Sequence, residues 1–190
     1  MNATKKIYTD GSCLGNPGAG GYAAIIIDDK NNRVEIVGGE RETTNNRMEL
    51  MAAIEALKKV SADDYIELFT DSSYLKNAFT KGWLVNWKRN GWQTTNKTPV
   101  LNIDLWKKLD ALILKRNVKF NWVKGHAGNS LNERCDKLAR AEATKQKNRP
   151  AKITEDKLMQ ERCDKLALKE ATKQKNKPAE KVKPVQLTLF

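Results

Sequence analysis

The sequence predicts an α/β fold built on a mixed sheet with an antiparallel edge. Apolar runs typical of strands come first along the chain, and helical and strand patterns then alternate. Two of these runs, residues 7–9 and 65–70, end at an aspartate followed by turn residues, which is typical of buried strands. A core of about 145 residues is long enough to bury an apolar interior of its own.

The first half of the chain predicts three strands and a helix. A strand at residues 6–9 is followed by a hairpin of residues 20–27 and 33–37, whose connecting turn is rich in Asp and Asn. Residues 46–60 repeat apolar side chains near helical spacing, and Thr44 stands where a helix cap is expected.

The second half predicts two more strands, which brings the sheet to five. A strand at residues 65–70 leads into a helix that Ser72 caps. A helix at 100–114, a strand at 118–123 and a helix from Leu131 to about Lys145 follow from the same periodicities.

The balance of charges points to an anionic partner. Lys and Arg outnumber Asp and Glu by 35 to 23, giving a net charge of +12, a field that favours nucleic acid. The sequence has no apolar stretch long enough to span a bilayer and no apolar signal-peptide core, so we expect no membrane association. Three cysteines without Cys-x-x-Cys spacing predict a reduced, cytoplasmic protein.

Four acidic residues are the candidate catalytic groups: Asp10, Glu49, Asp71 and Asp136. Asp10 and Asp71 each end a predicted strand, and ligands collect at the carboxyl ends of strands in open α/β sheets. If the two strands are neighbours, their carboxylates meet and need a cation or a shared proton, and hard oxygen ligands suit Mg²⁺ or Mn²⁺. Taken alone, each acid could be a surface charge or a helix cap, as Asp71 beside Ser72 illustrates.

Four blocks of sequence carry a resemblance to a known family. They are DGSCLGNPGAGG at residues 10–21, TNNRMEL at 44–50, TDS at 70–72, and WVKGHAG at 122–128 with NERCD at 132–136. In this order and spacing they resemble type 1 ribonuclease H, the bacterial ribonuclease HI-like enzymes, over roughly three-quarters of the chain. The resemblance implies a ribonuclease H-like fold, with helices on both faces of a five-stranded sheet.

The resemblance also implies an activity and a cofactor. It implies an endonuclease that hydrolyses the RNA strand of RNA–DNA hybrids to 5′-phosphates, with two Mg²⁺ ions, or Mn²⁺, held by Asp10, Glu49, Asp71 and Asp136. Asp10 is expected to bridge the ions.

His126, the sole histidine, follows Gly125 in a glycine-containing segment and matches a loop histidine that shuttles a proton at the leaving oxygen or assists product release. We expect a monomer that removes RNA primers and R-loops during replication.

Two further sets of residues match the family's contacts to the hybrid. RNA-strand contacts are expected from Cys13, Gly15, Asn16 and Asn45, where a 2′-hydroxyl must be read. DNA-strand contacts are expected from Thr44, Trp83, Asn86, Trp87, Lys88, Arg89, Trp92 and Asn102. One departure is Ser73, which stands where the family often has glutamine. Its shorter side chain weakens the contact that the glutamine makes to a minor-groove base edge.

Residues 76–103 contain no acid and interleave basic residues with tryptophan, which matches the family's basic protrusion. Packing in the core is an equal alternative for Trp87, because aromatic residues commonly anchor helices. Trp106 and Trp122 are predicted to be core residues.

The C-terminal part has a different composition, so we divide the chain into a catalytic domain at residues 1–147 and a basic, partly disordered tail at 148–185. The tail contains a duplication, because ERCDKLA at 133–139 returns at 161–167 and ATKQKN at 143–148 returns at 171–176. Asp164 copies Asp136 but lacks the preceding loop and strand, so we expect no metal ligand there.

The last five residues, 186–190, resemble the short peptide by which bacterial replication proteins bind the sliding clamp. The expected anchors are Gln186, Leu187, Leu189 and Phe190. Two alternatives remain open, namely that the segment packs on the core as an extra strand or is an apolar end without a partner.

Other functions are weighed against this interpretation. Another nuclease on the same fold, such as a resolvase, would lack the glycine-rich loop and the basic protrusion. A non-catalytic hybrid-binding or clamp-tethered scaffold would lack carboxylates, and all four are present. Cys135 with His126 could suggest a thiol nucleophile, but a packed apolar cysteine is favoured.

Overall fold

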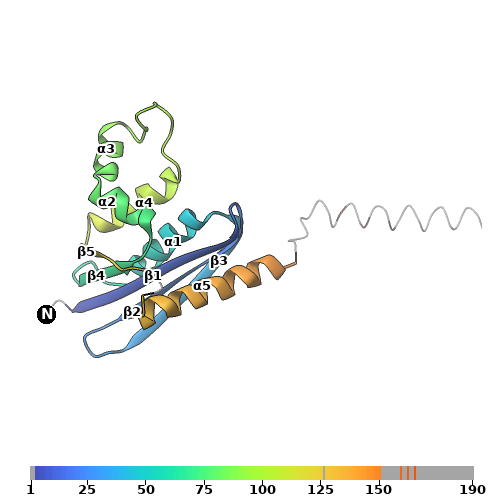
Figure 1. Cartoon of the computed structure of the whole chain (residues 1–190), viewed down its shortest axis with the longest axis horizontal. Coiled ribbons are helices and arrows are strands. Elements are labelled where there is room, and N and C mark those ends of the chain that lie inside the picture. Colours follow the sequence, from blue (N-terminus) through green and yellow to red (C-terminus); the bar gives the residue numbers. More distant parts are fainter. Residues whose placement is uncertain (1–2, 126, 151–158, 160–161, 163–164, 166–190) are drawn as a thin grey trace, which may run out of the picture. The chain divides into compact units, whose positions relative to one another are not determined.

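The computed structural model describes residues 3–125, 127–150, 159, 162 and 165, and the strands among them form one mixed sheet in the order β3-β2-β1-β4-β5 (Figure 1). The strands are β1 Thr4–Gly15, β2 Gly18–Ile27, β3 Arg33–Thr43, β4 Tyr65–Thr70 and β5 Asn117–Trp122. The helices are α1 Asn45–Lys58, α2 Ser73–Thr80, α3 Trp83–Arg89, α4 Ile103–Ile113 and α5 Ser130–Asn148.

The sheet confirms the predicted fold class. β2 pairs antiparallel with both β1 and β3, which makes the antiparallel edge hairpin. β4 pairs in parallel with β1 on one side and with β5 on the other. The two strands predicted to carry Asp10 and Asp71 are therefore neighbours, as the sequence argument required.

The prediction that the first strand stops at Asp10 is wrong. The parallel pairing with β4 ends at Thr9↔Thr70, but the antiparallel pairing with β2 continues to Gly15↔Gly18. β1 is long because it keeps one partner after losing the other. Asp10 consequently lies in mid-strand, at the first position beyond the end of β4.

Helices cover both faces of the sheet, as the resemblance implied (Figure 1). On one face, α1 and α4 pack over residues such as Ile7, Ile66 and Leu68, which form the larger apolar core. On the other face, α5 packs on β1, β2 and β3. A smaller core of alanines, Ile25 and Cys135 lies beneath α5.

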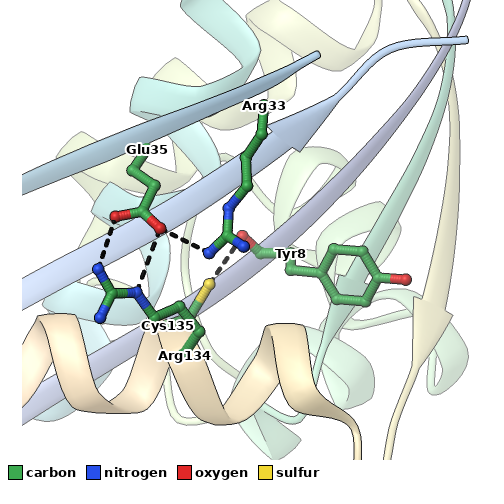
Figure 2. Close-up of polar contacts among 5 residues, drawn as sticks. All are labelled: Tyr8, Arg33, Glu35, Arg134 and Cys135. Carbon is green, nitrogen blue, oxygen red and sulfur yellow. Dashed lines mark hydrogen bonds and ion pairs between the residues drawn. The ribbon is translucent and has the colours of Figure 1, made fainter. Parts of the chain in front are cut away.

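α5 is tied to the sheet by polar contacts as well as by packing. Figure 2 shows the Arg134 guanidinium donating to both carboxylate oxygens of Glu35 on β3, at 3.2 and 3.1 Å, while Arg33 pairs with the same carboxylate. The Cys135 thiol donates to the Tyr8 carbonyl at 3.4 Å, and burial raises its pKa to about 12. Cys135 is therefore a packed residue, as the sequence favoured, rather than a nucleophile.

The predicted caps are in place, but α4 begins later than predicted and α3 was not predicted. The hydroxyl of Thr44 accepts the Arg47 N–H at 3.4 Å, and that of Ser72 accepts the Leu75 N–H at 3.3 Å. α4 begins at Ile103 rather than at residue 100, because Asn102 has a left-handed φ of 59°. α3 was not predicted, because its seven residues are too few to show a helical period.

The tryptophans divide between the core and the surface. Trp106 is fully buried as predicted, and Trp87 packs half-buried against it with the ring centroids 5.4 Å apart. The prediction that Trp122 is a core residue is wrong, because it is 48% exposed. Trp122 is the last residue of β5, which is an edge strand of the sheet and pairs only with β4.

The chain divides into Met1–Arg149 and Pro150–Phe190. His126, the duplicated copy with Asp164, and the peptide at 186–190 all lie outside the described residues, so the predictions made for them stay predictions. Among the helices that the structure describes, none is both long enough and apolar enough to cross a membrane.

Candidate active site

Three carboxylates from three separate elements converge at one edge of the sheet. Asp10 comes from β1, Glu49 from the first turns of α1, and Asp71 from the residue after β4. One oxygen of each lies within 4.8 Å of the others. Asp10 and Glu49 are only 7% and 6% exposed, so this cluster of like charges is removed from solvent.

β1 and α1 hold Asp10 and Glu49 together by direct backbone contact. A Cβ on Gly11 would lie 2.4 Å from the Glu49 nitrogen, so only glycine permits this approach. The Gly11 N–H donates to Asp10 Oδ1 at 2.7 Å, and the Asn45 amide donates to Glu49 Oε1 at 3.4 Å. Glu49 Oε2 is buried without a hydrogen-bond partner among the described residues.

Asp71 is held from two directions. The Asn132 amide on α5 donates to Asp71 Oδ2 at 3.0 Å, and the Trp122 indole donates to the Asp71 carbonyl at 3.3 Å. The backbone of Gly125 also lies close to the carboxylate, because a Cβ on Gly125 would be only 2.7 Å from Asp71 Oδ2. The Asp71 carboxylate therefore has little freedom to move between Asn132 and Gly125.

The electrostatics of the cluster favour a cation. Burial, followed by the charge of Asp71, raises the pKa of Asp10 to about 7. Burial, followed by the charges of Asp10 and Asp71, raises the pKa of Glu49 well above its usual range. An all-oxygen donor set, an unpartnered buried oxygen and mutually repelling carboxylates fit a hard divalent ion such as Mg²⁺.

The fourth predicted ligand, Asp136, is not part of this close group. It lies on α5, and its Oδ1 accepts from the Arg140 Nε at 2.7 Å. Its negative charge nevertheless contributes to the raised pKa of Asp10. Asp136 is thus beside the cluster, paired with a cation of its own helix.

The residues predicted to contact the RNA strand gather where the β1–β2 hairpin meets the start of α1. The Asn45 N–H donates to Asn16 Oδ1 at 3.2 Å, and the Cys13 thiol donates to the Thr43 carbonyl at 3.4 Å. Gly15 turns the hairpin with a φ of 96°. These contacts join the hairpin to the helix that carries Glu49.

Thr44 and Asn102, two of the residues predicted to contact DNA, both bind Arg47, Thr44 at its backbone and Asn102 at its guanidinium. Thr44 caps α1 by accepting the Arg47 N–H, and Arg47 Nη1 donates to Asn102 Oδ1 at 3.5 Å. Arg47 also forms an ion pair with Asp104 at 2.9 Å. The pair connects the start of α1 to the first turn of α4.

The remaining predicted DNA contacts lie on α3 and the loop after it, which project from the sheet (Figure 1). Trp83, Asn86 and Trp87 line a cavity of about 300 Å³ with residues of that loop. Lys88 does not line this cavity, and its Nζ forms an ion pair with Asp110 at 2.8 Å. Arg89 is exposed, and Trp92 has Lys107 5.7 Å from its ring centroid.

The model of the RNase H family matches residues 2–144, a span that holds the three-carboxylate cluster and Asp136. The chain belongs to the ribonuclease H family. It is 52% identical over 139 residues to the ribonuclease H of Pseudoalteromonas atlantica, covering 73% of this chain and 90% of the relative. It is 53% identical over 144 residues to that of Pectobacterium atrosepticum, covering 76% and 92%.

Solved structures of ribonuclease H agree in fold. LC9-RNase H1, a type 1 RNase H with the type 2 active-site motif, superposes with a TM-score of 0.67 at 30% identity, covering 77% of this chain and 74% of that one. LC11-RNase H1 in complex with an RNA/DNA hybrid superposes with a TM-score of 0.55 at 26% identity, covering 74% and 97%. The family match ends at residue 144, before the duplicated segment begins.

Sequence reasoning gave no role to three residues of this ribonuclease H site: Arg47, Asn132 and Trp122. Arg47 and Asn132 lie inside blocks that carried the resemblance, so their positions were noticed but their contacts were not. Trp122 also lies inside such a block, at residues 122–128, but nothing in the sequence indicated that its side chain is about half exposed.

Proposed function

We propose that this ribonuclease H is an endonuclease that hydrolyses the RNA strand of RNA–DNA hybrids with two Mg²⁺ ions, for which Mn²⁺ can substitute. The observation that carries the proposal is the cluster of Asp10, Glu49 and Asp71, with one oxygen of each within 4.8 Å of the others. Family membership gives the hydrolysis of hybrids, and the charge and chemistry of this cluster support the metal ions.

The carboxylates of Asp10, Glu49 and Asp71 would hold the ions, and we assign Asp10 as a ligand shared by both. Bound divalent ions would supply a Lewis acid for the phosphate and an activated water. The buried Glu49 Oε2, which lacks a partner among the described residues, is a ligand atom for an ion. Asp136 would complete the set of ligands in place of its pairing with Arg140 on the same helix.

His126 takes the remaining role in the proposal. It follows Gly125 in the chain, and Gly125 borders the Asp71 carboxylate. An imidazole would move a proton at the leaving oxygen or assist product release, since this group titrates near neutral pH.

The two strands of the hybrid are distinguished by different parts of the surface. We assign the RNA strand to Cys13, Gly15, Asn16 and Asn45, which adjoin the carboxylate cluster through α1. We assign a DNA phosphate to the place where Thr44 and Asn102 flank Arg47, and the neighbouring DNA sugars to the indoles of α3. Lys88 contributes less than its charge suggests, because Asp110 already neutralises it.

The enzyme is proposed to act as a cytoplasmic monomer on RNA primers and R-loops during replication. Residues 186–190 are proposed to bind the bacterial sliding clamp. Deleting them should abolish clamp binding in a titration and leave cleavage of free hybrid intact. Loss of thermal stability in the truncated protein would instead mean that the segment packs on the core, and the partner would then be dropped.

Cleavage of a hybrid labelled in its RNA strand, with and without Mg²⁺, tests the central proposal. Asp10→Asn, Glu49→Gln and Asp71→Asn should each abolish cleavage and leave hybrid binding measurable, because each removes a charged ligand and little shape. His126→Ala should slow turnover without abolishing it. Full activity of Asp71→Asn, or no cleavage by the parent protein in Mg²⁺, would contradict the assignment.

A further inference from the structure

Trp122 and Lys76 form a pair at the edge of the carboxylate cluster. Trp122 is the last residue of β5, and its indole N–H donates to the backbone carbonyl of Asp71 at 3.3 Å. Lys76, in the second turn of α2, places its ammonium 3.8 Å from the centroid of the Trp122 ring. The closest Lys–Trp stack among the described residues is therefore attached to a predicted metal ligand.

We propose that Trp122 and Lys76 are positioning residues that fix Asp71 for metal binding. The indole N–H holds the Asp71 backbone, and the Lys76 ammonium holds the plane of the indole. This inference rests on the proposed function, in which Asp71 is a metal ligand. The proposal gives a role to Trp122, which the sequence analysis placed in the core, and to Lys76, the first residue of the acid-free stretch at 76–103.

The backbone at Asp71 requires such an anchor. The last rungs of the sheet are Thr70↔Trp122 and a hydrogen bond from the Val123 N–H to the Thr70 carbonyl at 3.0 Å. α2 begins only at Ser73. Asp71 falls between the strand and the helix, so its carbonyl has no place in either repeating pattern, and the indole N–H supplies its partner.

The position of the Asp71 carboxylate tolerates little displacement. Gly125 borders it closely on one side, and the Asn132 amide binds Oδ2 at 3.0 Å. A shift of the backbone would lengthen the Asn132 contact or press the carboxylate against Gly125. Partners that orient a metal ligand commonly change metal affinity when removed, even though they never touch the ion.

Lys76 acts through the ring rather than through an ion pair. The Trp122 ring is about half exposed and is held by its hydrogen bond to Asp71, and a cation over its face further restricts its rotation. Ser72 caps the first turn of α2, and Lys76, four residues further along the chain, places its ammonium over the ring of the last residue of β5. α2 thereby helps to hold Asp71, which lies two residues before the helix begins.

Three variants separate the parts of this arrangement. Trp122→Phe removes the indole N–H and keeps an aromatic face. Lys76→Met removes the charge and keeps an unbranched side chain of similar length, and Lys76→Arg keeps a cation at this position. Lys81→Met is the matched control, because Lys81 lies 5.7 Å from the centroid of Trp83, away from Asp71. Binding of Mn²⁺ to the free protein is measured by calorimetry, and hybrid binding is measured in EDTA.

Trp122→Phe should weaken Mn²⁺ binding by about 10-fold and lower kcat at limiting metal, with KM for hybrid within about 2-fold of the parent. Lys76→Met should weaken it by about 2- to 5-fold, Lys76→Arg should recover most of the loss, and Lys81→Met should leave it unchanged. Saturating metal should restore kcat in each variant.

Two results would overturn the proposal. Unchanged Mn²⁺ binding with weaker hybrid binding in EDTA would make the exposed indole a substrate contact instead. Unchanged values in every assay would leave the pair without a role. Failure of the proposed function is a separate result, because the parent protein would then bind Mn²⁺ without cleaving hybrid.

Discussion

The Asn132 amide hydrogen-bonds the Asp71 carboxylate at 3.0 Å, joining residues 61 positions apart in the chain. This contact is the link from α5 to the carboxyl end of β4. Asn132 is buried, and its Oδ1 has no hydrogen-bond partner among the described residues. Its orientation is therefore determined chiefly by the donation to Asp71.

Asn132→Ala should lower activity at limiting Mg²⁺ by about 10-fold or more, because a ligand loses the partner that orients it. The measurement is kcat as a function of Mg²⁺ concentration. Asn129→Ala is the control, since it removes the α5 cap, at a cost of about 1 kcal/mol in stability, without touching Asp71. Equal losses in the two variants would attribute the effect to the helix rather than to the contact.

Without metal, the stability of the enzyme should fall as pH rises from about 4 to about 7. The folded protein keeps a proton on Asp10 that the unfolded chain, with an ordinary pKa of 3.8, has already lost. The free energy of unfolding therefore decreases across that interval. Urea titrations at several pH values in EDTA measure this, and Mg²⁺ should reduce the decrease.

Asp10→Asn should stabilise the metal-free protein at pH 8 by roughly 1–3 kcal/mol, since one unit of pKa corresponds to about 1.4 kcal/mol and the site can relax. The gain should shrink at pH 4, where the carboxyl group is already protonated in the folded state. A gain of the same size at both pH values would show that packing, and not charge, separates the two proteins.

Arg89→Ala should weaken hybrid binding and reduce the slope of log K against log salt by about one unit, as one phosphate contact is lost. Lys88→Ala should reduce the slope less and cost about 0.5–1 kcal/mol of stability, because Lys88 pairs with Asp110. Equal slopes for the two single variants would mean that the ion pair opens on binding.

Asp164→Asn should leave cleavage and metal binding unchanged, whereas Asp136→Asn should abolish cleavage. The duplicated copy lacks the loop and strand that precede Asp136 in the chain. An inactive Asp164→Asn together with an active Asp136→Asn would mean that the second copy takes the place of α5.

The positions of most strands and the helix caps were predictable because they depend on local chemistry. The hydroxyl groups of Thr44 and Ser72 cap the helices they precede, and the apolar runs became paired strands. The end of β1 was not predictable, because it depends on one neighbouring strand continuing after the other stops. The exposure of Trp122 and the pairing of Lys88 with Asp110 likewise depend on tertiary neighbours that periodicity does not reveal.

The contact of Gly11 with α1 makes Asp10 and Glu49 parts of a single rigid body, because the two backbones touch. Asp71 follows the last residue of β4. Asp136 lies on α5, and its side chain is paired with Arg140. When ions of different radius bind, the first pair cannot spread to follow them. Asp71 is also held in place, by Asn132 and Gly125, so the difference in coordination distance between Mg²⁺ and the larger Ca²⁺ would fall mainly on the side chain of Asp136.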